Sequence, residues 1–192
     1  ETVQGVSGAG GDADKYFTEY LRVRRDKAEL VKSVCAAQEG LISGDKRDMD
    51  LFVNVPFCTT RCSYCSFISA EIGRVKKFIP GYVELLVKEI EDARRLIAEY
   101  GYLLRAVYVG GGTPTSLEDK DFLRVMKALG GVDVEFTVEA GRPDTITYDK
   151  LKIMDDMGVT RISVNPQSLN DKTIALIGRG HTAADFYAAY DM

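Results

Sequence analysis

The sequence lacks the features that would point to a membrane or to a nucleic acid. No apolar run approaches the roughly 20 residues of a membrane-spanning helix, and the start has no charged-then-apolar signal pattern. Basic residues are not in excess, since 25 Lys and Arg against 29 Asp and Glu give a net charge of -4. Proteins that bind a phosphate backbone usually carry a basic surface. We therefore expect no membrane span, no nucleic-acid partner and a cytoplasmic location.

Histidine and cysteine are also scarce. The chain of 192 residues has a single histidine, His181, and four cysteines, of which three lie within the stretch VPFCTTRCSYCSF at 55–67. Thiols stay reduced in the cytoplasm, so clustered cysteines there more often bind a metal or catalyse a reaction than form disulfides. The fourth, Cys35, has apolar neighbours in a helical pattern, and we expect it to be a small buried hydrophobic residue.

The chain divides into two segments of different character. Residues 1–12 are rich in glycine and are expected to be loose, and a helical pattern runs from about Ala13 to Leu41. We predict a flexible start and helical preface over 1–49 and a domain over 50–192. Because the chain starts at Glu1 and ends within an amphipathic pattern, we expect it to be an excerpt from a longer protein.

Strands and amphipathic helices alternate four times after residue 50. The expected strands are LFVNVPF (51–57), LRAVYVGGG (104–112), VDVEFTVEA (132–140) and TRISVNPQ (160–167). The helices between and after them are expected to begin near Pro80, Ser116, Thr147, Asn170 and Thr182. This α/β alternation is typical of βα units on a parallel sheet.

The predicted strands have one apolar and one polar side. Successive side chains point to opposite faces, so Val53 and Val55 oppose Phe52 and Asn54, and the third and fourth strands alternate in the same way. A parallel sheet covered on both faces would be apolar throughout. We therefore favour an open or closed βα barrel whose polar inner face lines a ligand cavity. The alternative is that the polar residues lie at fraying strand ends.

The cysteine turn directly follows the first strand, at the carboxyl end where βα barrels and open parallel sheets place their sites. Cys58, Cys62 and Cys65 could each bind one iron of a cubane cluster and leave the fourth iron open to a ligand. The alternative is a structural zinc site, which would need Cys35 or His181 as its fourth ligand.

Four motifs carry a resemblance to a known family. Cys58, Cys62, Tyr64 and Cys65 resemble the C-x-x-x-C-x-aromatic-C motif of the radical S-adenosylmethionine (SAM) superfamily. The stretches GGGTPT (110–115), VEAGRPDT (138–145) and RISVNPQSLND (161–171) are similar to the oxygen-independent coproporphyrinogen III oxidase (coproporphyrinogen dehydrogenase)-like family, which includes a haem-chaperone branch. The resemblance implies a partial (β/α)6 barrel, truncated here after about four βα units, whose last two strands would lie beyond Met192.

The resemblance also assigns residues to a 4Fe–4S cluster and to SAM. It implies that Cys58, Cys62 and Cys65 bind the cluster and that no side chain is needed as a general base. The implied SAM contacts are Phe52, Tyr64, Gly111, Gly112, Thr113, Glu139, Gln167 and Arg179. Phe52 stands where the family usually has Tyr, and His181 is expected to have a local structural role.

The activity implied by the resemblance is an oxidative decarboxylation in haem biosynthesis. In the family, a reduced cluster splits SAM and yields a 5′-deoxyadenosyl radical, which takes a hydrogen atom from a porphyrinogen propionate and leaves a vinyl group. The implied partners are coproporphyrinogen III or haem, and an electron donor such as a flavodoxin or ferredoxin. Phe67 stands where the established dehydrogenases carry a further cysteine. A haem chaperone is therefore the alternative function, and a structural zinc domain is the second alternative.

Overall fold

A computed structural model describes residues 12–41, 45–67 and 70–192, which belong to two compact units, Glu1–Lys46 and Arg47–Met192. The described part of the first unit contains the helices α2 (Ala13–Lys15) and α3 (Arg25–Ala37) and the π-helical turn η1 (Tyr16–Tyr20). Residues 1–11 of the expected loose start lie outside the described residues.

The helical pattern predicted from about Ala13 to Leu41 is present, but it is interrupted where the chain turns at Arg22. Arg22 has a left-handed φ of 56°, and Arg24 donates to the carboxylate of Asp26 at 2.6 and 2.9 Å where α3 begins. The expected burial of Cys35 on α3 is wrong, since this thiol is only half-buried. Its apolar neighbour Val34 is itself 46% exposed, so this part of α3 does not lie in a core.

The second unit contains a four-stranded parallel sheet in the order β1-β4-β5-β6. The strands are β1 (Asp48–Val55), β4 (Leu103–Gly111), β5 (Glu135–Glu139) and β6 (Arg161–Ser163). Within this sheet, β4, β5 and β6 each pair with the strand that comes before them in the sequence, as expected for successive βα units. β6 is shorter than the expected 160–167, and Pro166 in that stretch has no N–H to donate to a neighbouring strand.

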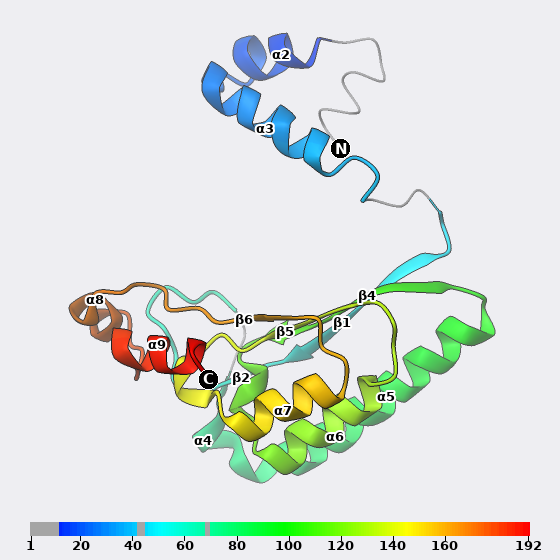
Figure 1. Ribbon diagram of the computed structural model, residues 1–192, viewed down its shortest axis with the longest axis vertical. Helices are drawn as coiled ribbons and strands as arrows, with labels where there is room; N and C mark the ends of the chain where they lie inside the picture. Colours follow the sequence, from blue (N-terminus) through cyan, green and yellow to red (C-terminus); the bar gives the residue numbers. More distant parts are fainter. Residues whose placement is uncertain (1–11, 42–44, 68–69) are drawn as a thin grey trace. The chain divides into compact units, whose positions relative to one another are not determined.

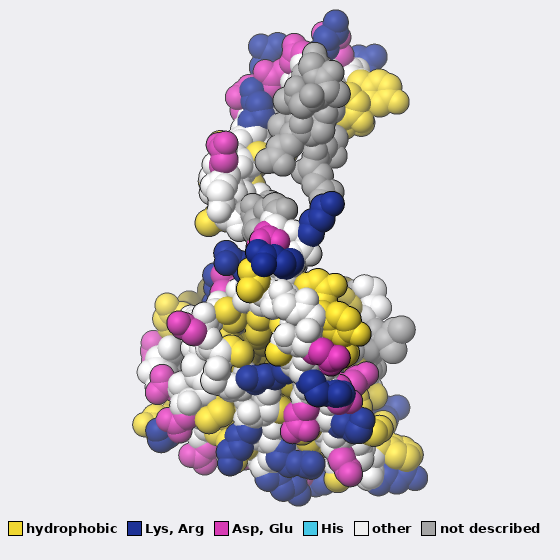
Figure 2. All heavy atoms as spheres, turned by 90° about the vertical axis from the view of Figure 1, so that its right-hand side faces the viewer, with side chains coloured by type: hydrophobic (Ala, Val, Ile, Leu, Met, Phe, Trp, Pro, Cys, Tyr) yellow, Lys and Arg dark blue, Asp and Glu magenta, His cyan; other side chains and the backbone are white. Residues whose placement is uncertain are grey.

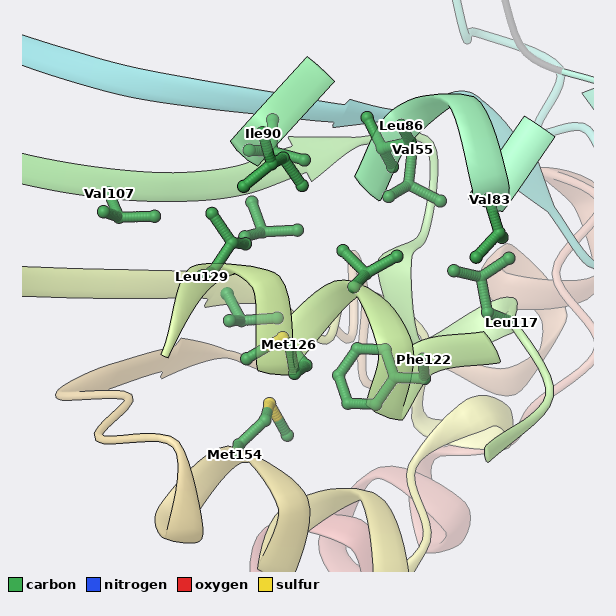
Figure 3. Close-up of a cluster of buried hydrophobic side chains, with 14 of the residues drawn as sticks. Val55, Val83, Leu86, Ile90, Val107, Leu117, Phe122, Met126, Leu129 and Met154 are labelled. Carbon is green, nitrogen blue, oxygen red and sulfur yellow. The ribbon is translucent and has the colours of Figure 1, made fainter. Parts of the chain in front are cut away.

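Three helices cover one face of this sheet (Figure 1), namely α5 (Ile79–Glu99), α6 (Asp119–Leu129) and α7 (Tyr148–Asp156). Their apolar stripes pack on the valines of the strands, and Figure 3 shows the resulting core. The buried side chains labelled there are Val55, Val83, Leu86, Ile90, Val107, Leu117, Phe122, Met126, Leu129 and Met154. Burial of this apolar surface is the main source of stability for the unit.

The opposite face of the sheet carries the strand side chains that alternate with those of the core. Phe52 pairs in register with Tyr108, Tyr108 pairs with Thr137, and Glu139 pairs with Ser163. Among the described residues of this unit, no helix covers that face in Figure 1. The predicted division into one apolar and one polar face is confirmed, and the architecture is that of a partial βα barrel.

Shorter elements surround the carboxyl ends of the strands. They are β2 (Phe57–Cys58), β3 (Ala70–Glu71), α4 (Ile72–Val75), η2 (Lys76–Phe78), η3 (Pro114–Ser116), η4 (Pro143–Thr145), α8 (Asp171–Leu176) and α9 (Ala183–Tyr190). β2 and β3 form a separate parallel pair that the sequence did not predict. Figure 1 shows α8 and α9 together at one end of the sheet.

The predicted helix caps are confirmed with one exception. The side chains of Thr147, Asn170 and Thr182 accept hydrogen bonds from the first turns of α7, α8 and α9. Ser116 does not cap α6, because it ends the one-turn helix that begins at Pro114, and its hydroxyl donates to the Phe57 carbonyl at 3.3 Å. α6 instead begins at Asp119.

The surface mixes charges of both signs. On the face drawn in Figure 2, Lys and Arg side chains lie among Asp and Glu. No helix in the described part of the chain is both long enough and apolar enough to cross a bilayer.

Candidate functional site at the carboxyl ends of the strands

One cavity lies where the segments that follow the four strands meet. It measures about 140 Å³, and its lining is Cys58, Cys62, Tyr64, Cys65, Phe67, Gly111, Gly112, Thr113, Glu139, Gly141, Arg142, Asn165, Gln167 and Arg179. The structure thus brings all three clustered cysteines together with seven of the eight predicted cofactor contacts. Phe52 is the exception, and its ring stacks on Tyr108 at 5.8 Å between ring centroids, on the exposed face of the sheet.

Three larger hollows lie elsewhere in the second unit. One, of about 310 Å³, lies between the region of α4 and the start of α6, and another, of about 420 Å³, lies beside β1 and α5; neither is lined by a cysteine. The third, of about 260 Å³, lies between the cysteine loop and α4 and is lined by Cys58 but by neither of the other two clustered thiols. The cavity of about 140 Å³ is the better candidate site because thiols, carboxylate, amide and guanidinium groups converge there.

Contacts from distant segments hold the cysteine loop. The Cys58 thiol lies 3.3 Å from the Thr113 hydroxyl, and the Thr60 hydroxyl donates to the Gly178 carbonyl at 2.8 Å. The Ser63 amide donates to the Ile177 carbonyl at 3.0 Å. The loop between the thiols is therefore fixed by the segment after β4 and by the end of α8.

Arg142 supplies a further contact that the sequence analysis missed. Its side chain is only 2% exposed and donates to the Thr60 carbonyl at 3.1 Å and to the Thr60 hydroxyl at 2.7 Å. Its guanidinium also lies 3.4 Å from the Asp144 carboxylate and 3.9 Å from the sulfur of Cys62. The only signal in the sequence was an arginine directly after a strand, inside the motif VEAGRPDT.

The glycine segment at the end of β4 packs closely on the end of β1 and on β2. A Cβ atom at Gly112 would lie 2.5 Å from the carbonyl oxygen of Phe57 and 2.8 Å from its nitrogen. The Thr113 amide donates to that same carbonyl at 2.6 Å. At Gly111 a Cβ atom would overlap the side chain of Asn54, and φ is +103°. Only glycine fits these two positions.

Glu139 has one fixed partner on the exposed face of the sheet. The Tyr108 hydroxyl donates to its carboxylate at 2.6 Å, and this hydrogen bond is the main cause that raises the pKa of Tyr108 to about 12. Tyr108 was not among the predicted site residues. It leaves the second carboxylate oxygen of Glu139 available to a ligand in the cavity.

Arg179 is a half-buried residue whose hydrogen-bond donors are only partly used. Its Nη1 donates to the carbonyls of Gly141 at 3.2 Å and Asn165 at 2.5 Å, whereas its Nε has no hydrogen-bond partner. A buried guanidinium N–H without an acceptor is costly unless a ligand supplies one. Gln167, which lines the same cavity, has a left-handed φ of 64°, a conformation that non-glycine residues adopt mainly at turns and functional sites.

The pKa values of two neighbouring side chains, Tyr64 and His181, are shifted. Partial burial of the phenol is the main cause that raises the pKa of Tyr64, with Cys62 acting in the same direction and Arg179 opposing it. His181 is buried, lies 3.3 Å from the Pro166 carbonyl, and has a pKa lowered first by burial and then by Arg179. It does not line the cavity.

The donor set fits an iron–sulfur cluster better than a single zinc ion. A structural zinc takes four protein ligands, whereas the lining of the cavity offers three thiols and no histidine. An iron–sulfur cluster can be held by thiolates from one short loop, and the three free thiols of this loop suit it. The unpaired Nε of Arg179 suits a carboxylate ligand, such as the methionine end of SAM.

Comparisons with known proteins show the family to which the chain belongs. The family model of the Radical SAM superfamily matches residues 54–192. Among relatives, the chain is 38% identical over 157 residues to "Oxygen-independent coproporphyrinogen-III oxidase-like protein HemZ" of Bacillus subtilis, covering 77% of this chain and 30% of that protein. It is 33% identical to "Heme chaperone HemW" of the same organism, covering 73% of this chain and 37% of that protein.

A solved structure gives the same result for the fold. The coproporphyrinogen III oxidase HemN from Escherichia coli, described as a radical SAM enzyme, superposes with a TM-score of 0.63 at 28% identity. The match covers 74% of this chain and 33% of that protein. The chain therefore spans about a third of the length of the relatives it matches, and the activity of a whole protein of this kind does not follow from the match alone.

Proposed function

The chain belongs to the radical SAM superfamily, and we propose that Cys58, Cys62 and Cys65 hold a 4Fe–4S cluster beside a SAM site. The observation that carries this proposal is the cavity in which the three thiols meet Arg179, whose buried Nε has no hydrogen-bond partner. When reduced and bound to SAM, such a cluster supplies one electron to the sulfonium and so gives access to radical chemistry.

The residues around the thiols can bind the separate parts of SAM. Arg179 offers a buried N–H donor to the carboxylate, and Glu139 offers an oxygen acceptor to the ammonium or a ribose hydroxyl. The backbone of Gly111 and Gly112 permits close approach, because neither position carries a side chain. Tyr64, which is exposed beside Cys62, offers a ring for stacking on the adenine.

The activity we propose is that of a coproporphyrinogen dehydrogenase-like oxidoreductase, which turns porphyrinogen propionates into vinyl groups in the cytoplasm. Two observations support it: the similarity to the HemZ protein of Bacillus subtilis and the superposition on HemN. An electron donor such as a flavodoxin or ferredoxin would reduce the cluster. The exposed polar face of the sheet, which carries Tyr108 and Glu139, is the surface on which a substrate would approach.

A haem chaperone is the second candidate function. The 33% identity to a protein named heme chaperone supports it, as does Phe67, an exposed ring that lines the cavity two residues after Cys65. In that case the same cavity would bind SAM, and haem would be carried to a client protein without formation of a vinyl group.

Anaerobic reconstitution followed by product analysis tests these proposals. Iron and sulfide near four per chain, lost in Cys62→Ala and kept in the control Cys35→Ala, are expected for the cluster. Conversion of coproporphyrinogen to a vinyl product with SAM and a reductant supports the dehydrogenase. Stable haem binding with no vinyl product would refute it and favour the chaperone. Zinc without sulfide would refute both.

A further inference from the structure

Arg142 is a buried cation whose acidic partner is shared with a second donor. Its Nε donates to the Asp144 carboxylate at 3.4 Å, and the same carboxylate also accepts from the Thr59 hydroxyl at 3.1 Å. The two terminal nitrogens of the guanidinium face the cysteine loop instead, at Thr60 and at the sulfur of Cys62. Burying a charge is costly even when it is paired, so the contacts of these two nitrogens with the cysteine loop are the feature to explain.

We propose that Arg142 is a positioning residue that fixes the cysteine loop and raises the reduction potential of the cluster by holding a positive charge against the sulfur of Cys62. This inference rests on the proposed function, because it needs the cluster. It adds a residue outside the three ligands and the eight expected SAM contacts.

The positioning part follows from where Arg142 grips the loop. Thr60 lies midway between the ligands Cys58 and Cys62, and Arg142 donates to both its carbonyl and its hydroxyl. That hydroxyl in turn donates to the Gly178 carbonyl, directly before Arg179. Through Thr60, the buried guanidinium thus links the loop that carries the thiols to the segment that carries Arg179, the proposed donor to the SAM carboxylate.

The electrostatic part follows from the position of the charge. The guanidinium Nη1 lies 3.9 Å from the Cys62 sulfur, in a place where the arginine side chain is almost fully removed from water. Reduction adds one negative charge to a cluster, so a nearby cation stabilises the reduced form more than the oxidised form. Hydrogen bonds to ligand sulfurs act in the same direction.

The test compares Arg142→Gln and Arg142→Lys with the control Arg61→Gln. Arg61 lies on the same loop, but its side chain is exposed, so its loss removes the same charge from a screened position. In the anaerobically reconstituted protein, Arg142→Gln is expected to lower the ratio of reduced to oxidised cluster at least tenfold at a fixed potential. That change equals a midpoint about 59 mV more negative for a one-electron couple. Arg142→Lys and Arg61→Gln should stay within threefold of the wild type.

Two experimental outcomes would overturn the electrostatic role, and they are distinguishable from each other. If Arg142→Gln assembles a cluster with the wild-type midpoint, the electrostatic role is overturned and the residue is only structural. If wild-type protein binds no iron and sulfide, the proposed function fails, and the effect on potential fails with it.

Limited proteolysis decides the positioning role without the cluster, including the case in which no Arg142 variant retains one. Trypsin cleavage after Arg61 in the cluster-free protein, followed by mass spectrometry, should be at least tenfold faster in Arg142→Gln than in the wild type. Equal rates would overturn the positioning role.

Discussion

Replacing Gly112 by alanine is the sharpest test of how closely the glycine segment at the end of β4 contacts β2. The added Cβ would lie 2.5 Å from the Phe57 carbonyl oxygen, which real Cβ atoms do not approach within 3.0 Å. The obstacle is backbone, so it cannot be relieved by a side-chain rotation. The two segments must separate by at least 0.5 Å.

The separation has a cost that can be worked from the hydrogen bonds it strains. Gly112 donates to the Val55 carbonyl at 2.9 Å, and Thr113 donates to the Phe57 carbonyl at 2.6 Å. Strain from inserting a methyl group into a packed site costs about 1–3 kcal/mol. Each weakened backbone hydrogen bond adds up to about 1 kcal/mol. We expect Gly112→Ala to lower the free energy of unfolding by about 2–4 kcal/mol in urea titrations.

Gly81→Ala is the matched control because it makes the same chemical change in open space. Gly81 lies in α5, and a Cβ atom there would meet nothing within 4 Å. Alanine should raise stability by about 0.5–1 kcal/mol, since it restricts the unfolded chain and favours the helix. A Gly112→Ala protein as stable as the wild type, with unchanged SAM affinity by equilibrium dialysis, would refute the close backbone contact.

Three further predictions concern polar groups around the site. Tyr108→Phe should weaken SAM binding about threefold to tenfold in equilibrium dialysis, because Glu139 loses the donor that orients it; unchanged affinity would contradict this. Lys150→Met should lower stability by about 1–3 kcal/mol in urea, because the buried Thr115 carbonyl loses the ammonium that donates to it at 2.7 Å; a change below 0.5 kcal/mol would count against it. Because burial lowers the pKa of His181, the unfolded chain binds its proton more readily. Stability should therefore fall as pH drops below about 6.5, by at most about 1.4 kcal/mol per unit, and His181→Gln should flatten that slope.

The parts of the fold that the sequence predicted correctly are those set by local patterns. The alternation of apolar residues in β1 and β5 correctly predicted which side chains of these strands face the core. The side chains of Thr147 and Asn170 cap helices that begin at the next residue, so their hydrogen-bond partners lie within three residues. The turn at Arg22 was missed, because nothing in the residue type favours a left-handed φ there. Ser116 failed as a cap because its hydroxyl bonds to Phe57, 59 residues away.

The same contrast holds for the candidate site. The thiols and glycines were predicted because their residue types and spacing suit a cluster and a close backbone contact. Arg142 and Tyr108 were missed, because their partners lie 82 and 31 residues away in the sequence. A single sequence carries no signal for such pairs before the order of the strands is known.

The cysteine spacing by itself does not determine where the three sulfurs lie. Only the short strand β2 reaches Cys58, and the remainder of the loop to Cys65 has no regular backbone ladder. Its position comes from Thr113 after β4, from Arg142 after β5 and from Gly178 after α8. These same segments supply the proposed contacts to SAM. A change that loosens the loop should therefore weaken cluster retention and SAM binding together, whereas a peptide with the same cysteine spacing alone should reproduce neither.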